Sequence, residues 1–301
     1  MTTPDMGHIT TRFAPSPTGR LHMGHALSAL IGWRLARAAG GRWLVRMEDI
    51  DQARCRPEHE AGILDDLAWL GLRPDGPVIR QSERRAAYDT ALERLRDLGV
   101  IFPCRCTRAD LAAAASAPHF PPIGPDGPLY PGTCRHLGLA PEGAAWRLDT
   151  ARAAALTGPL AFEDTALGHV TVNPHLLGDI VVARRDAGIA YHLAVVVDDA
   201  WQQVSDVVRG EDLRPATHAQ RLLQALLGLP APRYHHHQLV TGPDGKRLAK
   251  RDQAATLAAL RVAGQDPAVL RRQLFDMAAT LLHQSGRRWP VFAMAATAMG
   301  G

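Results

Sequence analysis

Apolar residues in the first fifty positions follow two different spacings, which predict strands alternating with a helix. HITTRFAPSP at 8–17 predicts a short strand that runs into a loop, and RWLVRMEDID at 42–51 predicts a second strand. Between them, 25–41 places its leucines and isoleucine on one helical face and ends at Gly40. This order favours parallel strands joined by a right-handed crossover, so a ligand should lie at the carboxyl ends of the strands.

Three later segments also have helical spacing, with residues that predict their ends. RPEHEAGILDDLAWLG at 56–71 has a proline in its first turn and a glycine after its last turn. The segment 82–99 begins at Ser82, which we expect to cap it, and 266–284 begins at the predicted cap Asp266. The first two extend the α/β layer, and the third predicts a helix at the carboxyl end.

The chain divides into regions that differ in their content of proline, glycine and β-branched residues. Residues 1–102 read as the first half of a Rossmann-like domain, and 103–160 are too rich in proline and glycine to continue a regular sheet. At 161–240 β-branched runs return, so we expect this segment to rejoin the sheet. Residues 241–301 then form a short helical part. The predicted fold class is α/β, a doubly wound parallel sheet with an inserted module.

Composition and charge exclude several classes of protein. Hydrophobic residues make up 46% and charged residues 21% of the 301 positions, which is ordinary for a globular protein with a buried core. No apolar run approaches the roughly 18 to 20 residues that span a bilayer, and the first residues lack the order of a signal peptide. We therefore expect a cytoplasmic protein with no membrane partner. The formal charge of +4 weakly favours an anionic partner.

Three of the four cysteines cluster in the inserted module, as Cys104, Cys106 and Cys134. In a reducing compartment three close thiols fit a structural zinc site better than disulfides, because thiolates are soft ligands that Zn²⁺ prefers. A fourth ligand would complete the tetrahedron, and on chemistry alone it would be His136 or His119. The alternative is three unrelated buried thiols.

The stretch RFAPSPTGRLHMGH at 12–25 is built to hold an anion. A helix beginning near Gly24 directs free backbone N–H groups at the preceding loop, and the imidazoles of His22 and His25 add donors that can follow phosphate charge. We interpret this stretch as a binding site for a triphosphate group. The alternative is that the two histidines merely cap the helix.

Three consecutive histidines, 235–237, follow in the second half of the predicted sheet. Successive side chains point in different directions from one backbone, so a single metal site here is not expected. We expect this run to lie beside the nucleotide.

The same stretch 12–25 resembles the first signature of class I aminoacyl-tRNA synthetases, and its APSPTG form resembles the glutamyl branch more than the glutaminyl branch. GKRLAKRD at 245–252 is similar to the second signature of that family. The resemblance implies that His22, His25 and Lys250 act in catalysis and that ATP, with Mg²⁺, is bound by the residues His22, Gly24, His25 and Lys250. The ammonium group of Lys250 would stabilise the phosphate charge that develops in the transition state.

Resemblance to glutamyl-type enzymes also implies a pocket for L-glutamate. The matching positions are Arg12, Phe13, Ala14, Pro15, Ser16, Glu48, Tyr191 and Arg209. Glu48 would bind the ammonium group, while Arg12 and Arg209 would donate charge-assisted hydrogen bonds to the carboxylates. Which arginine binds which carboxylate stays open. The alternative for Glu48 and Arg209 is a structural ion pair.

The inserted module is similar to that of glutamyl-queuosine tRNA(Asp) synthetases, which carries C-x-C and Y-x-x-x-C. This resemblance implies that Tyr130 is the fourth zinc ligand beside the three cysteines, with His136 as the alternative.

Only about 50 residues follow the lysine signature, too few for a separate anticodon-binding domain. The resemblance then implies a ligase of the shortened kind, which activates glutamate with ATP and transfers it from glutamyl-adenylate to queuosine in the anticodon loop of tRNA(Asp). Two alternatives remain, a glutamyl-tRNA synthetase that charges a tRNA 3' end and a non-catalytic tRNA-binding relative. We expect a monomer.

Overall fold

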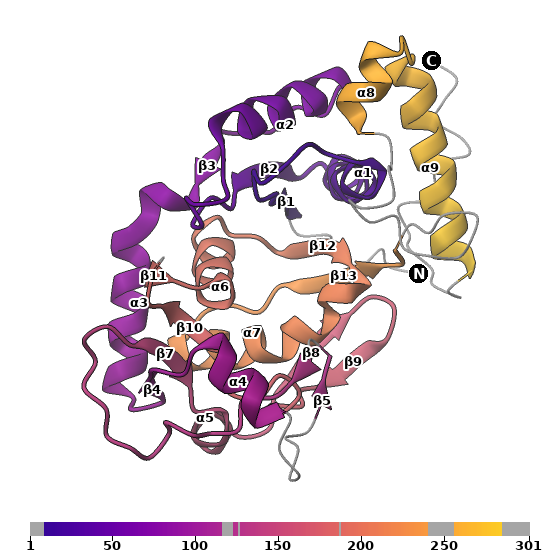
Figure 1. Cartoon of the computed structure of the whole chain (residues 1–301). Helices are drawn as coiled ribbons and strands as arrows, with labels where there is room; N and C mark the ends of the chain where they lie inside the picture. The colour runs from indigo at the N-terminus through magenta and orange to yellow at the C-terminus, as the bar shows by residue number, and fades with distance from the viewer. Residues whose placement is uncertain (1–8, 116–122, 126, 187, 240–255, 285–301) are drawn as a thin grey trace.

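Strands from three separate stretches of the chain form one sheet of seven strands (Figure 1). The structure is a computed structural model, and it describes residues 9–115, 123–125, 127–186, 188–239 and 256–284. The strand order is β3-β2-β1-β12-β13-β8-β9, and every neighbouring pair is parallel except β8 and β9. Their bounds are β1 Thr10–Phe13, β2 Arg42–Met47, β3 Ile79–Arg80, β8 Ala161–Asp164, β9 Gly168–Thr171, β12 Asp206–Gly210 and β13 Arg233–His237. The predicted α/β class with a parallel sheet is confirmed.

The predicted β-loop-α-β unit at the start of the chain is also confirmed. β1 is buried at all four positions and pairs in parallel with β2, with Thr10 opposite Arg42. Helix α1, Met23–Ala38, connects them and begins at the cap His22. Gly41 is required where the helix returns to the sheet, because any side chain there would run into the carbonyl oxygen of Ile9. The unit therefore places the loop before α1 at the carboxyl end of β1.

The helix predicted at 82–99 begins differently from the prediction. A 3₁₀ turn, η1 Gln81–Arg84, precedes helix α3, Arg85–Asp97. Ser82 lies inside this turn rather than at a cap, because its hydroxyl and its backbone N–H both donate to the carboxylate of Asp49, at 2.6 and 2.8 Å. The predicted cap is therefore wrong. Helix α2, Pro57–Trp69, is confirmed with its proline in the first turn.

A second, antiparallel sheet of four strands has the order β11-β10-β7-β4. Its strands are β4 Ile101–Cys104, β7 Ala145–Leu148, β10 Val181–Arg184 and β11 Gly188–Ile189. Of the segment expected to rejoin the main sheet, β8, β9, β12 and β13 do so, whereas β10 and β11 pair in this second sheet. The predicted start of the inserted module, 103, falls inside β4, and its predicted end, 160, falls between β7 and β10 of the same sheet. The division into domains stays a prediction.

The remaining elements are helices, 3₁₀ turns and a third, two-stranded antiparallel sheet formed by β5 and β6. They are α4 Arg108–Ala115, β5 Ile123–Gly124, β6 Gly127–Pro128, α5 Thr150–Thr157, α6 Tyr191–Trp201, η2 Glu211–Leu213, α7 Arg214–Leu227, α8 Leu257–Val262 and α9 Pro267–Gln284. In Figure 1, α1, α2, α8 and α9 lie in the upper half, near β1 and β2, and α3 to α7 lie below. The predicted cap of α9 is confirmed, because Asp266 Oδ1 accepts from the N–H of Ala268 at 2.7 Å.

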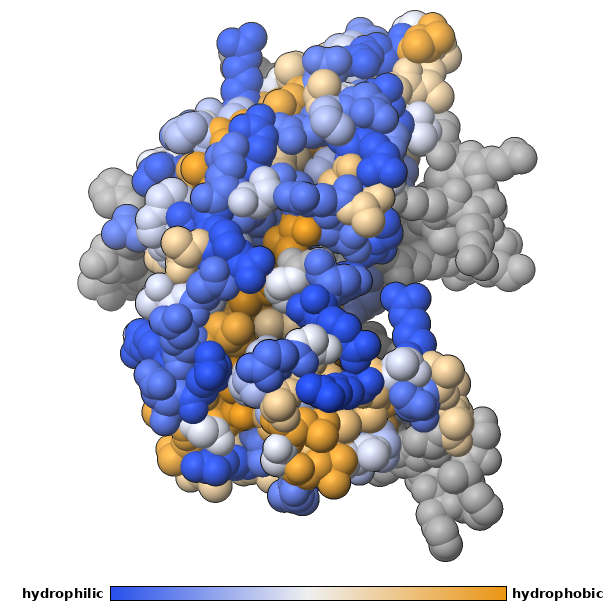
Figure 2. Space-filling model, turned by 60° about the vertical axis from the view of Figure 1, so that its left-hand side comes forward, coloured by the Kyte–Doolittle hydropathy of each residue, from blue (hydrophilic) through white to orange (hydrophobic). Residues whose placement is uncertain are grey.

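Two large clusters of buried hydrophobic side chains form the core. One joins α1, β2 and α9 through side chains such as Leu27, Trp43 and Leu274. The other packs α3 and α6 on the second sheet, through side chains such as Tyr88 and Leu193. Hydrophilic side chains cover much of the face in Figure 2, and hydrophobic patches show mainly in its lower half. None of the helices that the structure describes is long and apolar enough to span a membrane.

Candidate active site

A cleft of about 520 Å³ lies where the carboxyl ends of β1, β2 and β12 meet the amino ends of α1 and α6. Its walls contain every described residue that the sequence predicts for glutamate and ATP: Arg12, Phe13, Ala14, Pro15, Ser16, Glu48, Tyr191, Arg209, His22, Gly24 and His25. Lys250 lies outside the described residues. The structure thus brings the predicted set together in one cleft, and what each residue binds stays a prediction.

The cleft also contains residues that the sequence did not indicate, among them Ser28 and Asp212, and one residue of the predicted histidine run, His237. Ser28 lies four residues after Gly24, so helical periodicity could have placed it on the same face. Its hydroxyl lies 2.8 Å from Nε2 of His237. Of the three consecutive histidines, only His237 lines the cleft.

His22 and His25 form a reciprocal cap at the start of α1. Nδ1 of His22 accepts from the N–H of Gly24 at 3.2 Å, and Nδ1 of His25 accepts from the N–H of His22 at 3.3 Å. The two rings are stacked, with centroids 3.8 Å apart. Because each Nδ1 is an acceptor, a neutral ring carries its proton on Nε2. The rings therefore cap the helix and line the cleft as donors at the same time, and the two interpretations do not exclude each other.

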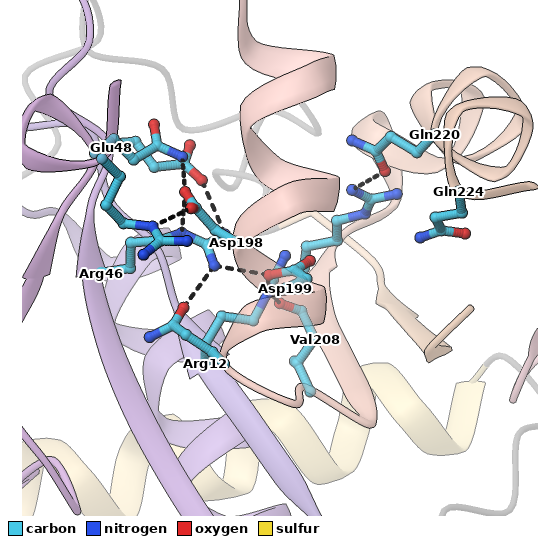
Figure 3. Close-up of polar contacts among 12 residues, drawn as sticks. Arg12, Arg46, Glu48, Asp198, Asp199, Val208, Gln220 and Gln224 are labelled. Atoms are coloured by element: carbon cyan, nitrogen blue, oxygen red, sulfur yellow. Dashed lines mark hydrogen bonds and ion pairs between the residues drawn. The ribbon is translucent and has the colours of Figure 1, made fainter. Parts of the chain in front are cut away.

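Arg12, Arg46, Glu48 and Asp199 form a buried charge network beside the cleft (Figure 3). Oδ1 of Asp199 lies 3.0 Å from Nε of Arg12 and 2.8 Å from Nη1 of Arg46. Arg46 is fully buried and also reaches Oε1 of Glu48, at 3.4 Å. In Figure 3, Arg46 comes from a strand of the sheet and Glu48 from just beyond its end, and Asp198 and Asp199 come from the helix that faces them.

The network affects the two carboxylates differently. Burial raises the pKa of Glu48, although Arg46 and Arg12 oppose this shift. For Asp199, burial works against ionisation, but the same two arginines hold its pKa below the usual value. Asp199 is therefore a fixed structural anion, whereas Glu48, with its side chain 11% exposed at the cleft, is an anion with a weaker internal partner.

Arg209 lines the same cleft and has different partners. Its Nε–H donates to Nε2 of His236 at 3.1 Å, Nη1 donates to Gln220 at 2.9 Å, and Nη2 donates to Thr217 at 2.6 Å. The residue is only 5% exposed. Among the described residues, no carboxylate forms an ion pair with this guanidinium group. The alternative considered from the sequence, a structural ion pair, is therefore not present for Arg209, whereas Glu48 does pair with Arg46.

The three clustered cysteines meet around one tyrosine. The sulfur atoms of Cys104, Cys106 and Cys134 all lie within 4.8 Å of one another. The hydroxyl of Tyr130 lies 3.4 Å from Sγ of Cys104 and 3.8 Å from Sγ of Cys106, and it accepts from the N–H of Cys134 at 2.8 Å. His136 is exposed, and His119 lies outside the described residues.

This donor set fits a metal ion with a preference for sulfur. A tetrahedral Zn²⁺ with Zn–S bonds of about 2.3 Å needs sulfur atoms about 4 Å apart, and Cys106 and Cys134 are 3.5 Å apart. Although burial opposes ionisation, the hydrogen bond from Tyr130 lowers the pKa of Cys134 to about 7. A thiolate, the form that binds metals, is thus accessible near neutral pH. The cluster could hold a metal ion.

Residues 8–284 match the family described as tRNA synthetases class I (E and Q), catalytic domain. This chain belongs to that family. A glutamyl-Q tRNA(Asp) synthetase of Rhodobacter capsulatus is 52% identical over 277 residues, which cover 88% of this chain and 99% of that protein. Another protein of that name, from Symbiobacterium thermophilum, is 47% identical over 270 residues, which cover 85% of this chain and 82% of that protein.

Among solved structures, a glutamate tRNA ligase from Elizabethkingia meningosepticum in complex with its amino acid is 30% identical, with a TM-score of 0.68. The match covers 81% of this chain and 52% of that protein, so the chain spans about half the length of this solved structure. Together the family and these relatives identify a ligase-type enzyme related to glutamyl-tRNA synthetases.

Proposed function

We propose that this enzyme activates L-glutamate with ATP to form glutamyl-adenylate, and then transfers the glutamyl group to queuosine in the anticodon loop of tRNA(Asp). The observation that carries the proposal is the composition of one cleft. Buried Arg12 and Arg209, the partly exposed Glu48 and the stacked imidazoles of His22 and His25 all line it. The printed names of the relatives from Rhodobacter and Symbiobacterium support the choice of acceptor.

Charged residues of the cleft can pair with the charges of glutamate. The substrate carries one ammonium group and two carboxylates, and the cleft offers two guanidinium groups, Arg12 and Arg209, and the carboxylate of Glu48, with Asp212 as a second carboxylate among its walls. Glu48 binds the ammonium group, and Arg12 and Arg209 bind the two carboxylates through charge-assisted hydrogen bonds. Residues 13–16, at the end of β1, line the same cleft.

The start of α1 suits a nucleoside triphosphate. The Nε2–H groups of His22 and His25 and the amino end of α1 offer donors to the phosphates. An oxygen of the glutamate α-carboxylate attacks the α-phosphorus in line, the bond to the bridging oxygen breaks, and pyrophosphate leaves. Lys250 stabilises the charge on the leaving group, and Mg²⁺ neutralises the phosphates when bound. Positioning and charge supply the catalysis, and no side-chain nucleophile is required.

In the second step a hydroxyl of the queuosine cyclopentene ring attacks the carbonyl carbon of the adenylate. The carbon–oxygen bond to AMP breaks, an ester forms, and the hydroxyl proton leaves with solvent. Because an anticodon loop is unpaired, its bases can be splayed into a pocket. The net charge of +4 supports binding of the tRNA phosphates and weaker association at high salt.

We also propose that the cysteine cluster holds a structural Zn²⁺, with Tyr130 as its fourth ligand beside Cys104, Cys106 and Cys134. The contact of the tyrosine hydroxyl with all three cysteines supports this choice over the exposed His136. The ion would hold the ends of β4 and the loop before β7 together. It has no part in the chemical steps.

The deciding experiment supplies labelled glutamate and ATP with four acceptors: tRNA(Asp) with queuosine, tRNA(Asp) without it, tRNA(Glu), and no tRNA. We expect label only on the first acceptor, in the fragment that contains the anticodon loop after nuclease cleavage. Label on the 3' end of tRNA(Glu) would establish the charging enzyme instead, the function printed for the Elizabethkingia protein. Absence of glutamate-dependent ATP–pyrophosphate exchange with every acceptor would leave a non-catalytic relative.

A further inference from the structure

Arg209 is connected to a buried carboxylate through an imidazole ring. Nε of Arg209 lies 3.1 Å from Nε2 of His236, and Nδ1 of His236 lies 2.6 Å from Oδ2 of Asp164. The three residues lie on the adjacent strands β12, β13 and β8. Their exposed fractions are 5%, 0% and 1%, so water does not compete for these hydrogen bonds.

The partners of the ring decide where its single proton lies. A guanidinium group only donates and an ionised carboxylate only accepts. Nδ1 of His236 therefore carries the proton and donates it to Asp164, while Nε2 accepts from Arg209. The hydroxyl of Thr217, which is 3.4 Å from the same Nε2, can also donate to it.

The ionisation states agree with this arrangement. Burial lowers the pKa of His236 to about 4, against the opposing hydrogen bond to Asp164, so the ring is neutral at pH 7. Burial also opposes ionisation of Asp164, but its hydrogen bonds to His236 and to the N–H of Ala166 hold its pKa below the usual value. The result is a carboxylate, a neutral ring and a guanidinium ion in series.

We propose that Asp164 and His236 are positioning residues that fix the guanidinium group of Arg209 while keeping its positive charge for a carboxylate of the substrate. This inference rests on the proposed function. A carboxylate in direct contact would orient Arg209 equally well, but it would compete with the substrate for the same charge. The ring instead transmits the orientation and separates the two charges.

The contrast with Arg12 shows what the ring changes. Arg12 contacts the carboxylate of Asp199 directly, at 3.0 Å, and its charge is shared with an internal anion. Three of the five N–H groups of Arg209 are held by neutral partners, which leaves two for a ligand in the cleft. Of the two guanidinium groups in the cleft, Arg209 is the one with the less compensated charge.

Asp164→Asn tests the proposal with almost no change in shape. Oδ1 of Asp164 accepts from the backbone N–H groups of Ala166 and Leu167, at 2.8 and 3.3 Å. In the variant only the amide oxygen can occupy this place, so the amide NH₂ faces Nδ1 of His236. The ring must then accept at Nδ1 and carry its proton on Nε2, where it opposes the N–H of Arg209.

We expect D164N to raise the KM for glutamate roughly 10- to 100-fold in ATP–pyrophosphate exchange, because a charged hydrogen bond that orients Arg209 is lost. The KM for ATP and kcat at saturating glutamate should change little. His236→Gln, which offers Arg209 an acceptor but breaks the link to Asp164, should give a smaller rise.

A matched control exists on the same strand. His235 lies next to His236 on β13, and its Nε2 is 2.6 Å from the buried carboxylate of Asp206, but its Nδ1 faces the hydroxyl of Thr165 rather than an arginine. Asp206→Asn removes a comparable buried carboxylate–imidazole pair. It should lower the free energy of unfolding without raising the KM for glutamate.

Nitrogen NMR of protein labelled with ¹⁵N-histidine reads the proton position directly, with the His236 signal assigned through H236Q. We expect the wild-type ring to be protonated at Nδ1 and the D164N ring at Nε2. Wild-type protonation at Nε2, an unchanged KM for glutamate in D164N, or an equal rise in D206N would overturn the proposal. Failure of the proposed function would show instead as wild-type protein without glutamate-dependent exchange, while the spectra would still report the ring.

Discussion

Arg12 and Asp199 form a buried ion pair, with Nε of the arginine 3.0 Å from Oδ1 of the aspartate, although 187 positions separate them in the chain. The same oxygen is 2.8 Å from Nη1 of Arg46. One carboxylate on α6 therefore compensates two guanidinium groups on neighbouring strands. This ion pair connects the strands that line the cleft to helix α6, which supplies Tyr191 to the same cleft.

Asp199→Asn should lower the free energy of unfolding by about 3 to 5 kcal/mol, because two buried arginines lose their shared anion while the volume of the side chain is kept. Urea denaturation at pH 7, followed by circular dichroism, measures this change.

Asp89→Asn is the control for the preceding change. Asp89 pairs with Arg85 at 2.8 Å on the exposed face of α3, with both side chains about half exposed. Its loss should cost less than about 1 kcal/mol. Equal midpoints for D199N and D89N would show that burial adds nothing to the pair between Arg12 and Asp199.

Arg209→Gln should raise the KM for glutamate roughly 30-fold or more, because a buried charged partner of the substrate is removed. Arg12→Gln should also raise it, but with a loss of stability, since Asp199 then loses one of its two partners. Exchange kinetics together with urea denaturation separate the two effects.

The response to glutamine then assigns the two carboxylates. The arginine whose replacement allows glutamine to be activated as well as glutamate binds the side-chain carboxylate. If neither variant accepts glutamine, discrimination against the amide depends on residues other than Arg12 and Arg209.

Glu48 should make glutamate activation sensitive to acid. Its folded-state pKa is raised by burial, so on acidification it gains its proton before an ordinary glutamate does. A neutral carboxyl group cannot pair with the ammonium group of the substrate. The kcat/KM for glutamate should therefore fall as the pH is lowered through this raised pKa, at a higher pH than an ordinary glutamate side chain would give. Glu48→Gln should be slow at every pH and lack this inflection; an unchanged profile in E48Q would assign the titration to another group.

Much of the main sheet could be predicted because its signals are local. The apolar positions of β1, α1 and β2 follow their periods, and Pro57 and Asp266 stand where helices begin. The prediction of Ser82 as a helix cap was wrong because a serine before a helix can also form hydrogen bonds to other residues. Its hydroxyl donates to Asp49, which lies 33 positions earlier in the chain. β10 and β11 have the β-branched composition of strands, but composition does not specify which sheet a strand joins.

The sequence predicted those residues of the cleft that belong to short motifs, but not the residues that pair with them. The resemblance gathered Arg12, Glu48 and Arg209 into one pocket, and the structure places all three there. The partners behind them could not be found in this way. Asp199 and His236 each pair with residues that lie far away in the sequence. His236 also lies in a run of three histidines that the sequence alone does not distinguish. Alternation along β13 gives each ring a different neighbour.

Cys134→Ser should abolish bound zinc while largely sparing glutamate activation. Wild-type protein purified without chelators should contain about one zinc ion per chain by mass spectrometry of the metal, and C134S should contain almost none. Exchange activity should stay within about threefold of wild type, because the cluster lies apart from the cleft residues. Cys55→Ser is the control, since Cys55 lies outside the cluster and should leave the zinc content unchanged.

Tyr130→Phe identifies the fourth ligand. Its hydroxyl contacts Cys104, Cys106 and Cys134, so its removal should weaken zinc binding roughly 10- to 100-fold, whereas His136→Ala should leave zinc affinity unchanged, because His136 is exposed. Competition with a colorimetric chelator measures both affinities. A larger loss in H136A than in Y130F would move the fourth ligand to His136, and wild-type protein without zinc would show that the three thiols are structural on their own.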